Sequence, residues 1–155
     1  MTKADFIDRV RNCERRLYRV ARSMLDREAD CEDAVQEALL KAWAKLPDLR
    51  EARYFETWLT RILINQCRTF YRRRPKAESA LTEDIPGPEP PDPALWEALQ
   101  ALPTKTRAAV ELHYIEGYGV RECAKLLGVP EGTVKWRLHQ GRNRLKQAIG
   151  EEDLT

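Results

Sequence analysis

The chain has 155 residues, of which 43% are hydrophobic and 34% charged, with a formal net charge of +2 at pH 7. This length and composition allow one domain, or two small ones, with packed cores. No stretch approaches the roughly 18 consecutive apolar residues of a membrane span, and the N-terminus carries acidic residues and no long apolar core, which argues against a signal peptide. We therefore expect a cytoplasmic protein without membrane insertion.

The charges are distributed unevenly along the chain. Residues 1–75 carry 17 basic and 12 acidic side chains, and residues 103–150 carry nine basic and four acidic ones. The segment between them carries one basic and six acidic side chains. Two basic units around an acidic connector are typical of a protein that holds a polyanion at two places.

The cysteines are too widely spaced for a common metal-binding or redox motif: they are Cys13, Cys31, Cys67 and Cys123. The chain has no CxxC motif, and neither of its two histidines lies at metal-ligand spacing from a cysteine. We expect reduced, structural thiols, with no disulfide framework, no metal and no cofactor.

Two helices are predicted at the start of the chain. Apolar residues recur at helical spacing over residues 4–25, and a second helix is expected near Asp30, where Asp30 and Asp33 have capping-box spacing. Six acidic residues and one basic residue lie between Asp26 and Glu37. This acidic face fits either a capped, solvated helix or a docking surface for a basic protein partner. The apolar stripe of this second helix is Val35, Leu39, Ala42, Trp43 and Leu46.

A third helix is predicted from about residue 55 to residue 74, after a short loop opened by Pro47. No acidic residue lies between Glu56 and Glu78, although this stretch contains six basic ones. A basic stripe so free of acids favours nucleic acid as a ligand, and the adjacent loop and the aromatic side chains near it could hold an unstacked base. The stripe is Arg61, Asn65, Arg68 and Arg72, opposite the inward-facing Phe55, Trp58, Leu59, Ile62, Leu63 and Phe70.

The segment 75–93 contains six prolines and Gly87, so we expect an extended linker. A short helix is predicted over residues 94–102, and Thr104 is placed to cap the helix that follows. Core candidates of that helix are Val110, Leu112, Tyr114 and Ile115. With no strand pattern visible, the predicted fold class is all-α, with small helical domains at residues 1–74 and 94–150.

Residues 120–146 are predicted to form two helices separated by a tight turn. Gly128 is expected to end the first helix in the left-handed conformation, and Pro130 suits the start of the second. The apolar stripe of the second helix follows at steps of four, three and four, as Val134, Leu138, Gly141 and Leu145.

The opposite side of this second helix is basic, aromatic and rich in amides. Such a helix, after a short helix and a Gly-containing turn, is typical of the helix-turn-helix motif that enters the DNA major groove. Arg and Gln can read base edges there, and Lys and Arg can neutralise phosphates. These residues alone also allow a helical hairpin with a solvated charged face. The outer residues and their flanks are Thr133, Trp136, Arg137, His139, Gln140 and Asn143.

Three motifs, in order, resemble the bacterial sigma factors of the extracytoplasmic-function (ECF) type, a class of the sigma-70 superfamily with regions 2 and 4 only. Residues 30–46 resemble region 2.2, residues 55–74 resemble regions 2.3 and 2.4, and residues 102–146 resemble region 4. The resemblance covers roughly residues 4–148, with 75–93 as the linker. It implies a non-enzymatic protein that binds core RNA polymerase, directs it to promoters and helps to open the DNA.

The resemblance also implies roles for individual residues. The helix at 30–46 would dock on the polymerase through Asp33, Gln36, Glu37, Leu40 and Lys41. At the −10 element, Asn65 and Thr69 would contact the non-template strand, and Arg61, Arg68 and Arg72 would hold phosphates. The loop 46–54 would capture a flipped base of that strand. The −35 element would be read as duplex DNA by Thr133, Lys135, Trp136, Arg137, His139, Gln140 and Arg142.

Two positions depart from the common pattern of the family. Trp136 stands where a small residue is usual, and Gln140 stands where arginine is frequent. We expect Trp136 to cover a thymine methyl group or the sugar–phosphate backbone, or else to pack against the preceding helix. Gln140 is expected to pair with an adenine edge. These departures bear on the preferred −35 sequence and not on the mode of binding.

Other functions fit these residues less well. A stand-alone helix-turn-helix regulator would need neither the basic stripe of the third helix nor the acidic face at 30–37. An enzyme such as a nuclease lacks support, because no carboxylates cluster at metal-ligand spacing. A redox-sensing adaptor would work through Cys31 or Cys67. In the family, an anti-sigma protein often covers the polymerase- and DNA-binding faces, which makes such a protein a further candidate partner.

Overall fold

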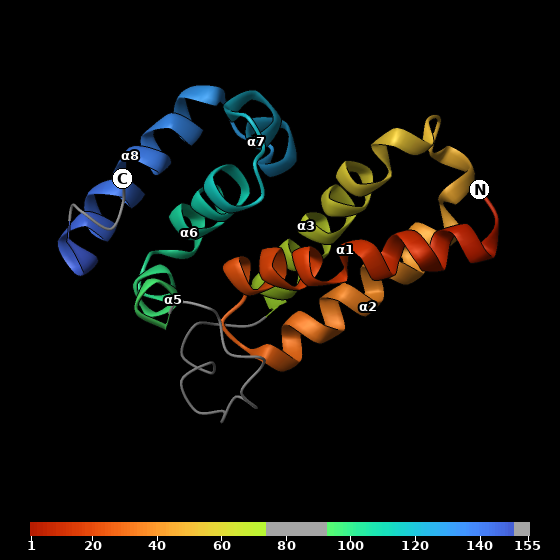
Figure 1. The fold of residues 1–155 in the computed structure, drawn as a ribbon, viewed down its shortest axis with the longest axis horizontal. Helices are drawn as coiled ribbons and strands as arrows, with labels where there is room; N and C mark the ends of the chain where they lie inside the picture. The colour runs from red at the N-terminus through yellow and green to blue at the C-terminus, as the bar shows by residue number, and fades with distance from the viewer. Residues whose placement is uncertain (74–92, 151–155) are drawn as a thin grey trace. The chain divides into compact units, whose positions relative to one another are not determined.

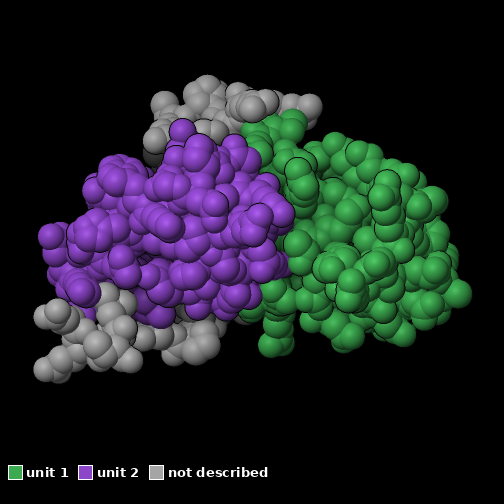
Figure 2. All heavy atoms as spheres, turned by 90° about the horizontal axis from the view of Figure 1, so that it is seen from above, with its two compact units in different colours: residues 1–85 green, residues 86–155 purple. Residues whose placement is uncertain are grey.

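The computed structural model describes residues 1–73 and 93–150 of the chain. Two compact units, residues 1–85 and 86–155, are coloured separately in Figure 2. The all-α fold class is confirmed, since the described residues contain helices and no strand. The predicted linker 75–93 lies outside the described residues, except for Pro93 at the start of α5. The elements (Figure 1) are α1 (Lys3–Met24), α2 (Glu28–Ala44), η1 (Leu46–Asp48), η2 (Ala52–Tyr54), α3 (Phe55–Arg73), α5 (Pro93–Gln100), α6 (Thr104–Val110), η3 (Glu111–Ile115), α7 (Val120–Leu127) and α8 (Glu131–Ile149).

In unit 1, the helices α1, α2 and α3 each pack against the other two (Figure 1). Helix α3 buries Phe55, Leu59 and Leu63, as its periodicity predicts. It also buries Ile64 and Cys67 completely, which the predicted stripe left out. A helix held between two neighbours needs a wider apolar face than a helix with one neighbour. Three side chains of the predicted stripe are only partly buried, because they lie at the edges of this wider face: Trp58, Ile62 and Phe70.

Helix α2 differs from its prediction at both ends. It begins at Glu28, so Asp30 is a buried residue of the first turn and does not occupy the predicted N-cap position. At the other end, Trp43 keeps 44% of its surface exposed and packs edge-on against Phe6, with 5.2 Å between ring centroids. The buried apolar residues of α2 are Cys31, Ala34, Val35, Ala38 and Ala42. Because these side chains are short, α1 and α3 can pack closely against α2.

In unit 2, helices α5, α6 and α7 pack against α8. The N-cap of α6 is Pro103, so Thr104 is the first helical residue and not the predicted cap. Helix α6 continues into η3, a turn of π-helix. A π turn is wider than an α turn and changes the register of the side chains within it. As a result, Tyr114 and Ile115 are exposed although they were predicted in the core, while Val110 and Leu112 are buried as predicted.

The helix-turn-helix forms as predicted. Gly128 ends α7 with φ of 67°, in the left-handed region, and Pro130 is the N-cap of α8. A Cβ atom built on Gly141 would lie 2.5 Å from Val110 Cγ2, so the backbone of α8 approaches α6 too closely for a side chain at this position. The whole predicted stripe is buried: Val134, Leu138, Gly141 and Leu145.

All four cysteines are free thiols, and all four are buried. Burial raises the pKa of the Cys13 and Cys123 thiols to about 11 and that of Cys31 to about 12, and it also raises the pKa of Cys67. Since the thiolate is the reactive form, these side chains are both shielded and protonated at neutral pH. This counts against a redox-sensing adaptor that works through Cys31 or Cys67.

Over residues 1–73 and 93–150, no helix combines the length and the hydropathy that crossing a bilayer requires. The same ranges contain no group of three or more His, Cys, Asp or Glu side chains arranged to hold a metal ion.

Candidate functional site

The first candidate surface is the face of α2 that points away from α1 and α3. Leu40 is 66% exposed at its centre, and Trp43 is half exposed one turn further on. Exposed apolar side chains within a charged rim are typical of a protein–protein contact. Burial of the opposite stripe brings all five predicted docking residues to this surface: Asp33, Gln36, Glu37, Leu40 and Lys41.

The second surface is the basic stripe of α3. Arg61 and Asn65 are exposed, and Arg68 and Thr69 are partly exposed. The Thr69 hydroxyl donates a hydrogen bond of 3.2 Å to the carbonyl oxygen of Asn65, so Thr69 faces the helix backbone as well as solvent. Arg72 belongs to α3, but its side chain lies outside the described part. The structure therefore brings together four of the five residues predicted for the −10 element.

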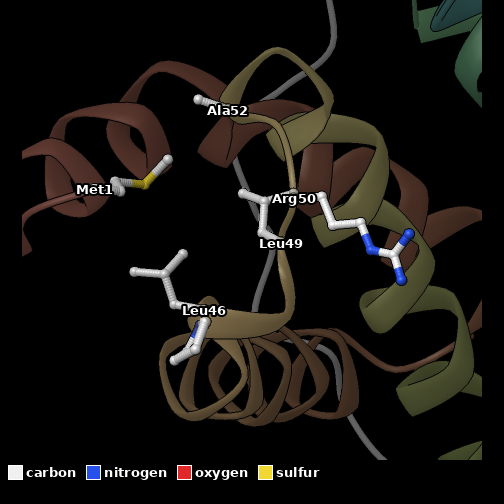
Figure 3. A pocket seen from close by; sticks show the side chains of 6 residues that line it. Met1, Leu46, Leu49, Arg50 and Ala52 are labelled. Atoms are coloured by element: carbon white, nitrogen blue, oxygen red, sulfur yellow. The ribbon is translucent and has the colours of Figure 1, made fainter.

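Between α2 and α3 the loop 46–54 forms two short 3₁₀ helices, η1 and η2. It borders a hollow of about 420 Å³. In Figure 3, Leu46 and Leu49 lie around the hollow, while the guanidinium group of Arg50 points away from it. A hollow lined mainly by apolar side chains, none of them aromatic, beside a basic helix would accept an unstacked base. The lining residues are Met1, Leu46, Pro47, Leu49, Arg50 and Ala52.

Sequence reasoning reached this loop through its place beside the basic stripe and through the family resemblance, although the lining of the hollow contains none of the aromatic side chains that it expected. The apolar residues Leu46, Pro47 and Leu49 in a connection between helices were an available signal, because loop side chains are usually polar. The contribution of Met1 had no such signal, since it depends on how α1 packs beside the loop.

The third surface is the outer side of α8. Trp136 is 62% exposed, which contradicts the alternative that it packs against the preceding helix. The side-chain amide nitrogen of Asn143 lies 3.2 Å from Nε2 of the His139 ring. The predicted −35 residues are all at least partly exposed: Lys135, Trp136, His139 and Arg142 are exposed, and Thr133, Arg137 and Gln140 are half-buried.

Known protein families and structures match both units. The chain matches the Sigma-70 region 2 family over residues 9–76 and the Sigma-70, region 4 family over residues 93–145. The ECF RNA polymerase sigma factor SigM of Mycobacterium tuberculosis is 34% identical over 146 residues, which cover 90% of this chain and 74% of SigM. This chain belongs to the ECF sigma factor family.

Solved structures of other sigma factors resemble this ECF sigma factor. The sigma factor RpoE of Bartonella quintana, in complex with the anti-sigma factor NepR, superposes with a TM-score of 0.79 and 26% identity over 95% of this chain and 98% of RpoE. CnrH, in complex with the cytosolic domain of CnrY, has a TM-score of 0.68 and 30% identity over 94% of this chain and 88% of CnrH.

The family assignment confirms the predicted function as an RNA polymerase sigma factor that acts in transcription initiation, and it does not favour a stand-alone regulator. Sigma factors are in general DNA-binding initiation factors and not catalysts. The region 2 match contains the α2 surface, the α3 stripe and the lining of the hollow except Met1. The region 4 match contains α5 to α7 and α8 as far as residue 145. The roles of the individual residues on these surfaces stay predictions.

Proposed function

We propose that this ECF sigma factor divides its work between two domains, a region 2-like domain at residues 1–74 and a region 4-like domain at 94–150, joined by the linker 75–93. The carrying observation is that three chemically different surfaces occur on three different helices. These are the apolar and acidic face of α2, the basic stripe of α3 and the basic, aromatic face of α8. The protein acts in the cytoplasm, with core RNA polymerase and promoter DNA as partners, and has no enzymatic activity of its own.

The α2 surface is the proposed dock for core polymerase. Leu40 offers an exposed apolar anchor, and Asp33 and Glu37 place negative charge beside it. An apolar centre supplies binding energy, while charged neighbours fix orientation and exclude wrong partners. Gln36 and Lys41 complete the rim.

The −10 element is the proposed ligand of α3 and the hollow. Arg61, Arg68 and Arg72 would neutralise phosphates of the non-template strand, and Asn65 and Thr69 would contact its bases. Taking a base out of the duplex stack costs about a few kcal/mol. Stacking on aromatic side chains returns about 1–3 kcal/mol per base, and the residues that line the hollow are not aromatic. Capture of one base in the hollow would therefore offset some of the cost of opening.

The −35 element is the proposed ligand of α8, entered as duplex through the major groove. Lys135 and Arg142 are exposed and suited to phosphates, whereas Gln140 can form a bidentate pair with adenine. The exposed indole of Trp136 would cover a thymine methyl group or lie along the backbone. Thr133, Arg137 and His139 flank these contacts.

Substitutions on α8 are expected to separate these two kinds of contact. Lys135→Ala and Arg142→Ala should each weaken holoenzyme binding to all −35 sequences alike and lower the slope of log affinity against log salt by about 1. Gln140→Ala should instead relax the preference at one base pair by about 1–3 kcal/mol. Filter binding of holoenzyme to a panel of −35 variants over a range of salt measures both quantities. If Gln140→Ala leaves the holoenzyme's preference unchanged at every base pair of the −35 element, Gln140 does not read a base.

An anti-sigma protein is a further proposed partner. RpoE of B. quintana is known in complex with the anti-sigma factor NepR, and CnrH in complex with the cytosolic domain of CnrY. The exposed Leu40 and Trp43 on α2 and Trp136 on α8 offer an inhibitor of this kind apolar footholds in both units. Such an inhibitor would compete with core polymerase for α2. If no inhibitor co-purifies with the protein from its native host, this proposal is contradicted.

A further inference from the structure

Arg9 of α1 reaches across to the loop that borders the hollow. Its Nη1 donates a hydrogen bond of 2.7 Å to the carbonyl oxygen of Ala52, which lies 43 residues away in the sequence. The same guanidinium group lies 5.9 Å from the centroid of the Phe55 ring. Ala52 is one of the residues that line the hollow. One side chain of α1 is therefore attached directly to the wall of the proposed base-binding site.

The loop's remaining hydrogen bonds, within the described part of the chain, are local. Leu49 donates its N–H to the carbonyl of Leu46 in η1, and Tyr54 donates its N–H to the carbonyl of Glu51 in η2. The Arg53 side chain pairs with Glu51 at 2.6 Å. These contacts shape the two short turns. At the end of the loop, the backbone N–H of Phe55, the first residue of α3, also donates to the Ala52 carbonyl. Within the described residues, the hydrogen bond from Arg9 is the one that joins the loop to α1.

The neighbours of Arg9 on α1 hold α3 and not the loop. Phe6, one turn earlier, meets the Phe55 ring edge-on at 5.7 Å, and Arg16, two turns later, pairs with Glu56. Both partners belong to the first turn of α3. Arg9 itself is exposed, and exposed contacts of this kind add little to global stability. Its effect on the loop can therefore be separated from an effect on folding.

We propose that Arg9 is a positioning residue for base capture: it holds the Ala52 wall of the hollow in place before DNA arrives. This inference rests on the proposed capture of a non-template base by the loop. A guanidinium group that donates to a carbonyl forms a charge-assisted hydrogen bond, stronger than a neutral one. A loop ordered in advance does not lose conformational freedom when the ligand binds, so the ligand binds more tightly.

The test compares Arg9→Met with a matched control, Arg11→Met, in holoenzyme with core RNA polymerase. Methionine keeps an unbranched stem and nearly the helix propensity of arginine, and Arg11 is an exposed residue on the same helix. The probe is a fork-junction promoter selected by the wild-type holoenzyme, with a single-stranded −10 non-template strand. Each −10 base is removed in turn to leave an abasic site.

In the wild type and Arg11→Met, removing the captured base should weaken binding about tenfold, the size expected for one stacked base. In Arg9→Met the intact probe should bind several-fold more weakly, and removal of the base should cost about twofold or less. Arg9→Lys, which keeps one charged donor, should fall between them. All variants should unfold at the wild-type temperature. A merely structural role of Arg9 would weaken binding of the intact and abasic probes equally.

Two results would overturn the inference, and they differ. If Arg9→Met keeps the tenfold loss on base removal, the loop is in place without Arg9, and base capture itself stands. If no −10 base matters to the wild type, base capture by the hollow is wrong, and the positioning role of Arg9 falls with it.

Discussion

The Gly141→Val variant is expected to lose at least tenfold in transcription from promoters that depend on a −35 element. A Cβ atom at this position would lie 2.5 Å from Val110 Cγ2 and 3.3 Å from Thr106 Cγ2. Overpacking of a tight contact costs about 1–3 kcal/mol, and the methyl groups of valine add to the clash. Helix α8 would therefore move away from α6 and carry the DNA-reading face with it. Circular dichroism during thermal unfolding and run-off transcription measure the two consequences.

A matched pair of alanine substitutions in α8 tests whether the close approach is the cause. Alanine gains up to about 1 kcal/mol over glycine in a helix. At Gly132, where an added Cβ would have no atom of the described chain within 4 Å, this gain should appear as higher stability. At Gly141 the clash should reverse the sign. If Gly141→Ala is as stabilising as Gly132→Ala, the contact of α8 with α6 does not require glycine.

The double variant Glu37→Lys, Leu40→Ala is expected to bind core RNA polymerase at least about 100-fold more weakly than the wild type. Truncating an exposed apolar anchor at an interface centre costs about 2 kcal/mol or more. Reversing a charge that complements the partner weakens binding further. Both residues are exposed on α2, so the fold should be unaffected. Fluorescence anisotropy of labelled protein titrated with core enzyme measures the affinity.

The control for this experiment is Glu14→Lys, a charge reversal at an exposed position of α1 outside the docking surface. It should bind core enzyme like the wild type. A double variant with unchanged affinity would mean that the α2 face is solvated and serves another purpose, the alternative that its sequence also allowed.

Much of the fold follows from local sequence signals. The apolar stripe of α8 and the αL glycine at 128 were predictable, because helical periodicity and glycine's freedom at positive φ act over a few residues. The start of α2 was misplaced because Asp30 matched a cap by spacing, although its environment is buried. Tyr114 and Ile115 were misplaced because a π turn interrupts the 3.6-residue period on which the prediction relied.

Of the candidate site, too, local sequence patterns predict only the parts that do not depend on how distant segments pack together. The faces of α2, α3 and α8 were predictable, since a buried stripe determines the opposite exposed face. The hollow was not, because its walls come from Met1 and from residues 46–52, which meet only after α1 packs beside the loop. The bond from Arg9 to Ala52 joins residues 43 positions apart and involves a backbone carbonyl, so no sequence pattern marks it.

Run-off transcription with purified core RNA polymerase and a promoter library randomised at both elements tests the central claim most directly. We expect transcripts only when the protein and core enzyme are both present, and the selected promoters should share two motifs at a fixed spacing. The absence of transcripts, with duplex DNA retained by the protein alone, would contradict this account. The helix-turn-helix would then act without polymerase, and the α2 face would not be its dock.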